Sequence, residues 1–171
     1  MAMIYVSSLS GLASVAGALG RFDLLTLLSP GHAGDGHRGL GAGRHLQLDF
    51  HDINEPTPGL LAPDAGTVRA ILDFGRAPKN PLLIHCWAGI SRSSAAAFAI
   101  ACDRNPGFER AIAMELRRRA PSATPNRLMV KLADDLLGRD GGMVEAIAAI
   151  GRGADAFEGA PYQLPLNWPI G

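Results

Sequence analysis

Cysteine is scarce in this sequence, because Cys86 and Cys102 are the only two in 171 residues. Two cysteines cannot supply the disulfide framework of a small secreted domain, so we expect a reducing compartment, the cytoplasm. Residues 1–5 lack the basic region and the long apolar core of a signal peptide, and we expect no cleaved leader. No apolar run approaches the length of a transmembrane helix, which predicts that the protein is not inserted in a membrane.

The sequence also lacks an excess of charge, because 16 Lys and Arg residues balance 16 Asp and Glu residues. Nucleic-acid-binding domains usually carry a basic excess, so we expect no nucleic-acid partner. The five histidines are scattered, without the paired helical spacing and nearby carboxylate of a common metal site. We therefore expect no metal and no other cofactor. Nothing in the sequence indicates the oligomeric state.

The composition, with 47% hydrophobic residues, suits one globular domain with a sizeable core. Apolar runs and alternation predict strands at 4–7, 23–28, 45–48 and 81–84. Helical spacing and end signals predict helices at 10–20, 63–75, 92–104, 108–119, 125–137 and 143–150. Ser10 is expected to cap the first of these helices, and Pro63 to lie in the first turn of the second. We therefore expect a single α/β domain spanning 1–171, with 151–171 as an irregular tail.

The stretch 29–43 is rich in glycine, and it could at first suggest a phosphate cradle. It lacks the Gly-Lys-Ser/Thr ending of a nucleotide-binding loop, and it does not open a helix. We interpret it as a flexible surface loop.

The most informative stretch runs from His85 to Ser93, between a predicted buried strand and a predicted helix. Unpaired backbone N–H groups and the helix dipole make such a junction an anion-binding site. Cys86 begins the loop, where a positive field favours the nucleophilic thiolate. Arg92 ends the loop with a planar guanidinium that can bind two oxygens of a phosphate. Gly89 gives the backbone the freedom to turn its amides inward.

The pattern His-Cys-two residues-Gly-two residues-Arg-Ser resembles the signature of the cysteine-dependent protein tyrosine phosphatases, in particular short, bacterial-type members of the dual-specificity branch. The resemblance implies a central, mostly parallel sheet flanked by helices. It also implies hydrolysis of phosphomonoesters through a phosphocysteine intermediate without a metal. In this interpretation Cys86 is the nucleophile, His85 orders the loop, and the Ser93 hydroxyl eases departure of the sulfur. The phosphate oxygens are held by the Arg92 guanidinium and by the loop amides of Trp87, Ala88, Gly89, Ile90, Ser91 and Arg92.

The resemblance also implies a general acid on the loop that follows the third predicted strand. The segment 45–52 resembles the dual-specificity strand that ends in its acid, and this match assigns the role to Asp52. Asp49 is the alternative carboxylate, and His51 is the alternative acid because imidazole titrates near neutrality. Asn126, preceded by Pro125, resembles a residue that supports the active-site loops in that branch, although a plain helix N-cap explains it equally well.

Other functions remain open at this stage. The leading substrate class is a phosphotyrosine protein, and a phosphoinositide or another small phosphate ester is the alternative. A phosphatase-like module could instead bind phosphorylated partners without turnover. A sulfurtransferase would have less need of His85 and Ser93. An arsenate reductase would need further cysteines, and only Cys102 is available. We interpret Cys102 as a small core residue, and the alternative is that it resolves a reversibly oxidised Cys86.

Overall fold

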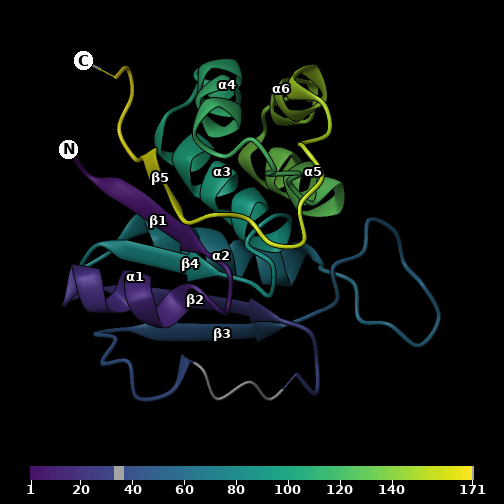
Figure 1. The fold of residues 1–171 in the computed structure, drawn as a ribbon. Helices are drawn as coiled ribbons and strands as arrows, with labels where there is room; N and C mark the ends of the chain where they lie inside the picture. The colour runs from purple at the N-terminus through teal and green to yellow at the C-terminus, as the bar shows by residue number, and fades with distance from the viewer. Residues whose placement is uncertain (33–36, 171) are drawn as a thin grey trace.

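The computed structural model describes residues 1–32 and 37–170, and within them five strands form one sheet in the order β3-β2-β4-β1-β5 (Figure 1). The strands are β1 (Met3–Ser7), β2 (Asp23–Leu28), β3 (His45–Asp49), β4 (Leu82–His85) and β5 (Tyr162–Pro165). The first four are mutually parallel, whereas β5 runs antiparallel to β1 at one edge. The mostly parallel α/β fold expected from the sequence is therefore confirmed.

Helices cover both faces of this sheet (Figure 1). They are α1 (Leu12–Leu19), α2 (Ala65–Arg76), α3 (Arg92–Arg104), α4 (Glu109–Arg119), α5 (Arg127–Leu137) and α6 (Gly142–Ile150). Helix α1 packs on one face through a small apolar cluster, and the other helices build the main core on the opposite face. None of the described helices is both long and apolar enough to cross a membrane.

Helix α3 is the centre of the main core, and its residues from Arg92 to Cys102 are all buried. Its alanine-rich sequence favours a helix and leaves little side-chain bulk, so neighbouring elements approach closely. Gly75 of α2 illustrates this approach, because a Cβ built there would lie 2.7 Å from side-chain atoms of Ile100. Helix α3, which follows the stretch 86–91, is thus closely packed against its neighbours.

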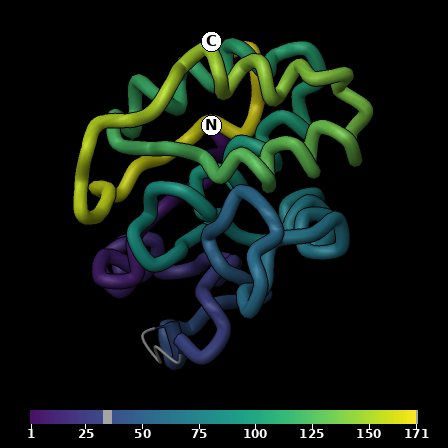
Figure 2. Tube along the Cα trace, turned by 90° about the vertical axis from the view of Figure 1, so that its right-hand side faces the viewer, coloured from purple at the N-terminus to yellow at the C-terminus, as the bar shows by residue number. Residues whose placement is uncertain are grey.

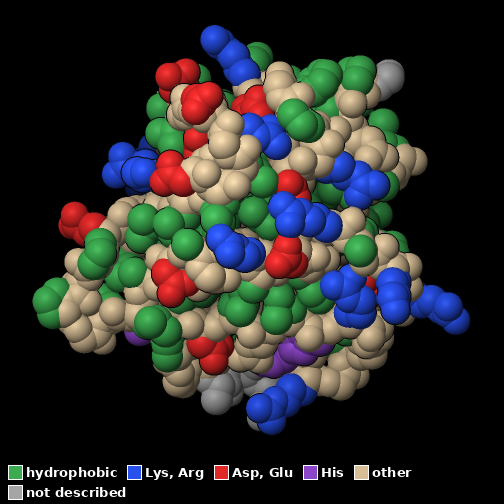
Figure 3. All heavy atoms as spheres, turned by 180° about the vertical axis from the view of Figure 1, so that it is seen from behind, with side chains coloured by type: hydrophobic (Ala, Val, Ile, Leu, Met, Phe, Trp, Pro, Cys, Tyr) green, Lys and Arg blue, Asp and Glu red, His purple; other side chains and the backbone are tan. Residues whose placement is uncertain are grey.

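Charges of both signs are mixed among apolar side chains on the face seen from behind in Figure 3. This distribution matches the balanced composition of the chain.

Three expectations about local structure were wrong. The segment 151–171 contains β5, whose Tyr162 and Leu164 are buried against β1 while Gln163 is exposed. The N-cap of α1 is Gly11, whereas the Ser10 hydroxyl donates to the Glu158 carboxylate.

The third wrong expectation concerns the start of α2, because Pro63 does not lie in the first turn of the helix. Asp64 is the N-cap and its side chain accepts from the Thr67 amide, so Pro63 precedes the helix. In the glycine-rich stretch 29–43, residues 33–36 lie outside the described part of the chain.

Candidate active site

The candidate site lies at the edge of the sheet where the parallel strands end. Strand β4 ends at His85 and α3 begins at Arg92, so Cys86–Arg92, the anion loop, turns at this edge. Figure 2 faces this side and shows the anion loop beside the β3–α2 loop (residues 50–64) and the C-terminal strap (residues 151–161). Ligands of open α/β sheets bind at this edge, as expected from the sequence.

Carbonyl groups of the anion loop point outward, toward three different segments of the chain. The donor amides and acceptor carbonyls are Leu9 to Trp87 at 3.0 Å, Gly159 to Ala88 at 2.8 Å, Thr124 to Ile90 at 3.0 Å and Asn126 to Ser91 at 3.2 Å. Among the described residues, the amides of Trp87, Ala88, Ile90, Ser91 and Arg92 make no hydrogen bond within the chain. A loop with its carbonyls paired outside and its amides free offers donors to an anion.

The Cys86 side chain is buried and receives polar contacts from two sides. The Gly89 amide donates to Sγ at 3.3 Å, and the Ser93 Oγ lies 3.1 Å from the same atom. Both contacts stabilise negative charge on the sulfur. Gly89 has φ +69°, and a Cβ there would lie 2.8 Å from the Ser8 backbone nitrogen, so both backbone conformation and space require glycine.

Arg92 is held by one end of its guanidinium group. Its Nη1 donates to the Phe50 carbonyl at 2.8 Å and to the Ser29 hydroxyl at 3.2 Å. Its Nε is buried and has no partner among the described residues. A buried donor without an acceptor is unfavourable, so this nitrogen is available for an anionic oxygen from outside the chain.

His85 lies between Cys86 and a row of polar groups that crosses the sheet. Its Nδ1 is 3.3 Å from the Cys86 carbonyl, and its Nε2 is 2.9 Å from the Thr26 hydroxyl. That hydroxyl is also 2.9 Å from the His45 Nε2. Burial disfavours the imidazolium and lowers the pKa of His85 to about 4, so the ring is neutral at pH 7.

The donor and the acceptor of each hydrogen bond in this row follow from the chemistry of the groups. The Cys86 carbonyl can only accept, so the neutral His85 ring carries its proton on Nδ1. Its Nε2 must then accept, and the Thr26 hydroxyl donates to it. The Thr26 oxygen in turn accepts from the Nε2–H of His45. Thr26 therefore fixes both the orientation and the tautomer of the histidine that supports the loop.

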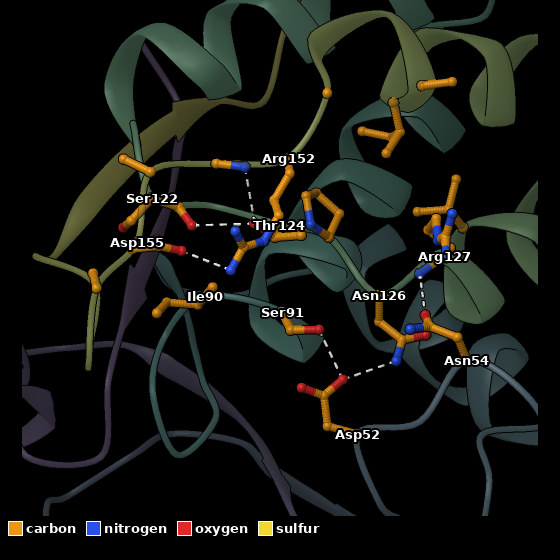
Figure 4. Close-up of a pocket in the computed structure, with 18 of the residues that line it drawn as sticks. Asp52, Asn54, Ile90, Ser91, Ser122, Thr124, Asn126, Arg127, Arg152 and Asp155 are labelled. Carbon is orange, nitrogen blue, oxygen red and sulfur yellow. Dashed lines mark hydrogen bonds and ion pairs between the residues drawn. The ribbon is translucent and has the colours of Figure 1, made fainter.

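Asp52 reaches the anion loop from the β3–α2 loop. Its Oδ1 accepts from the Ser91 hydroxyl at 2.7 Å and from the Asn126 Nδ2 at 2.8 Å (Figure 4). Asp49, by contrast, is exposed on β3 and accepts from Gln47 of the same strand. The geometry favours Asp52 over Asp49 as the acid that faces the loop.

The alternative acid, His51, already uses one ring nitrogen. Its Nδ1 accepts from the Leu61 amide at 2.9 Å, while its own amide donates to the Leu61 carbonyl. This pair closes the β3–α2 loop just before Asp52, which gives His51 a structural part in holding the loop.

Asn126 joins the β3–α2 loop, the anion loop and α5. Its Oδ1 accepts from the Met129 amide as the N-cap of α5, and its Nδ2 donates to Asp52 and to the Ile53 carbonyl. The cap and the loop contacts are therefore made by the same side chain. The two explanations that the sequence left open are geometrically compatible.

Two further residues from the sequence lie apart from the reacting groups. The Trp87 ring is 40% exposed and packs edge-on against Phe157 at 5.4 Å between ring centroids. Cys102 is buried on α3, where burial raises the pKa of its thiol and favours the protonated form. Cys102 is ten residues beyond Arg92, about 15 Å along the helix axis, so the geometry favours a core role for its thiol.

Thr26, Ser29, Phe50 and Gly159 support the site and were not expected from the sequence. Thr26 alone gives a signal, as a hydroxyl between pairs of leucines in a buried strand. The others act through a backbone group or a short hydroxyl, which carries no recognisable motif. Among the described residues, no group of three or more His, Cys, Asp or Glu side chains could hold a metal ion.

Several solved structures with this arrangement of elements are phosphatases. The chain has the fold of the protein tyrosine and dual-specificity phosphatases, which confirms the resemblance drawn from the motif. PTP-2 phosphatase of Cydia pomonella is 18% identical, with a TM-score of 0.58 over 76% of this chain and 83% of that one. The Yvh1 phosphatase domain of Chaetomium thermophilum is 19% identical, with a TM-score of 0.56 over 81% and 92%. Tk-PTP in its active form is 24% identical, with a TM-score of 0.50 over 78% and 88%.

At the level of sequence, no protein-family model and no curated protein matches this chain. The likeness is therefore one of fold, and the chemistry has to be argued from the residues of the site.

Proposed function

We propose that this protein hydrolyses phosphomonoesters through a phosphocysteine intermediate, with Cys86 as the nucleophile. The observation that carries the proposal is the anion loop itself, in which the buried Cys86 sulfur shares one turn with free amides and the open Nε of Arg92. The fold of protein tyrosine and dual-specificity phosphatases supports the same chemistry. The leading substrate class is a phosphotyrosine protein, because the chain shares its fold with protein tyrosine phosphatases.

In the first step the Cys86 thiolate attacks phosphorus and an S–P bond forms as the ester P–O bond breaks. The loop amides and the Arg92 guanidinium bind the equatorial oxygens, where charge develops in the transition state. Asp52 gives its proton to the leaving oxygen. Because two donors occupy Oδ1 and no described hydrogen bond reaches Oδ2, the proton belongs on Oδ2.

In the second step water attacks the phosphocysteine and the S–P bond breaks. The Asp52 carboxylate accepts a proton from this water, by microscopic reversibility. The Ser93 hydroxyl, 3.1 Å from Sγ, donates a hydrogen bond to the sulfur as it regains negative charge. Inorganic phosphate leaves, and the thiolate is restored. No metal or cofactor enters this scheme, and it requires a reduced thiol, which supports a cytoplasmic location.

The proposal is tested by hydrolysis of para-nitrophenyl phosphate in the presence of a chelator and a thiol reductant. We expect turnover by the wild type and none by Cys86→Ser, because the serine hydroxyl is a far weaker nucleophile than a thiolate. Cys102→Ser is the matched control, because it replaces the other buried cysteine and should keep turnover. Asp52→Asn should lower kcat by about 10²–10⁴-fold, the usual contribution of a general acid.

Turnover that survives in Cys86→Ser would contradict the nucleophile assignment. If the folded, reduced wild type binds phosphate or vanadate but hydrolyses no phosphomonoester, the chain is a phosphate-binding module and the proposed function is wrong.

A further inference from the structure

A groove of about 770 Å³ opens beside the anion loop, on the side of Asp52 and Ser91 (Figure 4). One wall comes from the anion loop and the start of α5, and the facing wall comes from α6 and the C-terminal strap. Its apolar lining includes branched side chains from the anion loop, α5 and α6, together with a proline and three alanines: Ile90, Val130, Val144, Ile147, Pro125, Ala148, Ala154 and Ala156. The volume is typical of sites that enclose a ligand group rather than a single water or ion.

Polar side chains also line the groove: Asp52, Asn54, Ser91, Ser122, Thr124, Asn126, Arg127, Arg152 and Asp155 (Figure 4). Arg152 pairs with Asp155 across one end at 2.6 Å, and both side chains are exposed. Arg127 lies at the other end, where its amide donates to the Asn54 side chain. The rest of the lining is apolar, so the groove offers an apolar surface beside the phosphate site to a neighbouring group of the substrate.

We propose that this groove binds a large apolar side chain next to the phosphorylated residue of a phosphopeptide. The inference rests on the proposed function, which places the phosphate in the anion loop. Ile90 and Ser91 belong to both the anion loop and the groove, so the two sites are continuous. The groove lies beside the loop rather than at its floor, and it suits a group separated from the phosphate by some length of chain.

The free main chain of the strap favours a polypeptide as the occupant. Within the described residues, the backbone N–H and C=O groups of 155–158 make no hydrogen bond to the rest of the chain. They lie between Ala154, whose amide donates to the Pro121 carbonyl, and Gly159, whose amide donates to Ala88. An extended peptide could pair with these groups while its side chain fills the apolar groove.

The local charge argues against an anionic lipid surface as the alternative partner. The charged residues that line the groove are Asp52 and Asp155 against Arg127 and Arg152, so they balance. Membrane surfaces rich in acidic lipids attract basic segments, and this balanced lining offers no such attraction. A peptide needs no such basic surface.

The test compares phosphotyrosine peptides that differ at one position at a time. The residue just before or just after the phosphotyrosine is either leucine or alanine. Ala148→Trp fills the groove from an exposed position of α6, and Ala149→Trp adds the same bulk at the next exposed position, outside the groove. At one of these two positions, we expect the kcat/KM of the wild type for the leucine peptide to exceed that for the alanine peptide by about tenfold or more. The preference should disappear in Ala148→Trp and persist in Ala149→Trp, while hydrolysis of para-nitrophenyl phosphate stays unchanged in both.

Binding is measured in parallel on the Cys86→Ser background, with the same peptides, so that the groove is tested independently of turnover. If the wild type hydrolyses para-nitrophenyl phosphate but neither kcat/KM nor Kd depends on leucine, the groove proposal is overturned and the proposed function stands. If no phosphomonoester is hydrolysed yet Kd shows the leucine preference and its loss in Ala148→Trp, the groove stands and the proposed function fails. Hydrolysis of phosphoinositide in vesicles that Ala148→Trp abolishes, without any peptide preference, would assign the groove to a lipid and overturn the proposal.

Discussion

The Thr26 hydroxyl is the smallest group on which the organisation of the site depends. It is buried on β2 and lies 2.9 Å from an imidazole nitrogen of His85 on one side and of His45 on the other. Since β2 and β4 are neighbours in the sheet, with Thr26 in register with His85, the contact follows directly from strand pairing.

We expect Thr26→Val to lower the free energy of unfolding by about 1–3 kcal/mol, because it leaves the Nε2 of a buried histidine without its donor. Valine keeps the shape of threonine, so the loss reports the hydroxyl rather than the volume. Thr26→Ser keeps the hydroxyl and removes a methyl group instead. Urea denaturation of the two variants checks this prediction, and equal losses in both would mean that the hydroxyl contributes little.

The low pKa of His85 predicts a dependence of stability on pH. In the unfolded chain a histidine titrates near its ordinary value of 6.5, whereas burial lowers the pKa of His85 in the folded protein to about 4. Between these values the unfolded state binds the proton and the folded state does not, so the free energy of unfolding decreases as the pH falls from about 6.5 to 4.

The full loss attributable to His85 is on the order of 3 kcal/mol, from the conversion of a pKa difference into free energy. Urea denaturation at pH 7.5, 6, 5 and 4 measures it. His85→Gln, which does not titrate, is the control and should show a smaller decrease over the same range. If His85→Gln loses stability as steeply as the wild type when the pH falls, other groups cause the dependence.

At the scale of elements, the caps of α2 and α5 offer a matched comparison. Asp64 caps α2 through the Thr67 amide at 2.8 Å, and Asn126 caps α5 through the Met129 amide at 2.9 Å. Only Asn126 also donates to Asp52. The N-cap of α5 is therefore hydrogen-bonded to a residue of the candidate site, whereas the N-cap of α2 is not.

We expect Asp64→Ala to lower the free energy of unfolding by about 1 kcal/mol, as the loss of an N-cap usually does, and to leave kcat unchanged. Asn126→Ala should lower stability by a similar amount or more, and it should also lower kcat because Asp52 loses one of its two donors. Thermal unfolding and steady-state hydrolysis of para-nitrophenyl phosphate measure both effects. If kcat is unchanged in Asn126→Ala, the side chain is only a cap.

Elements with a strong local pattern could be predicted from the sequence. The leucine-rich β2 and the alanine-rich α3 show their type within a few residues, and the His-to-Ser motif between β4 and α3 marks the loop. Strand β5 could not be predicted in this way. It has four residues, follows a proline-containing segment, and is defined only by pairing with β1 at the other end of the chain.

The same distinction applies to the candidate site. Cys86, Arg92 and Ser93 lie within one motif, and Asp52 could be proposed because the segment 45–52 resembles the dual-specificity strand that ends in its acid. The support of the loop by Thr26 and Gly159 comes from positions far away in the sequence, and it depends on strand order and on the path of the strap. Such contacts are properties of the assembled fold.

At the scale of the whole molecule, the anion loop is held between the two ends of the chain. The Leu9 amide, just after β1, donates to the Trp87 carbonyl, and the Gly159 amide, just before β5, donates to the Ala88 carbonyl. Strands β1 and β5 pair with each other, so the two donors are fixed by one part of the sheet. The orientation of the first loop amides therefore depends on both termini being in place.

Gly159 is the position at which this dependence can be measured. It is buried against the loop, and a Cβ there would lie 3.0 Å from the Gly89 carbonyl oxygen, closer than side-chain carbons normally approach. We expect Gly159→Ala to lower kcat/KM for para-nitrophenyl phosphate by roughly tenfold, because small displacements of catalytic donors have large effects on rate. Ala160→Ser changes the neighbouring exposed residue and should leave kcat/KM unchanged. If Gly159→Ala lowers the melting temperature but not kcat/KM, the strap stabilises the fold without shaping the loop; a loss of kcat/KM in the folded protein would mean that the C-terminal segment helps to set the geometry in which phosphate is bound.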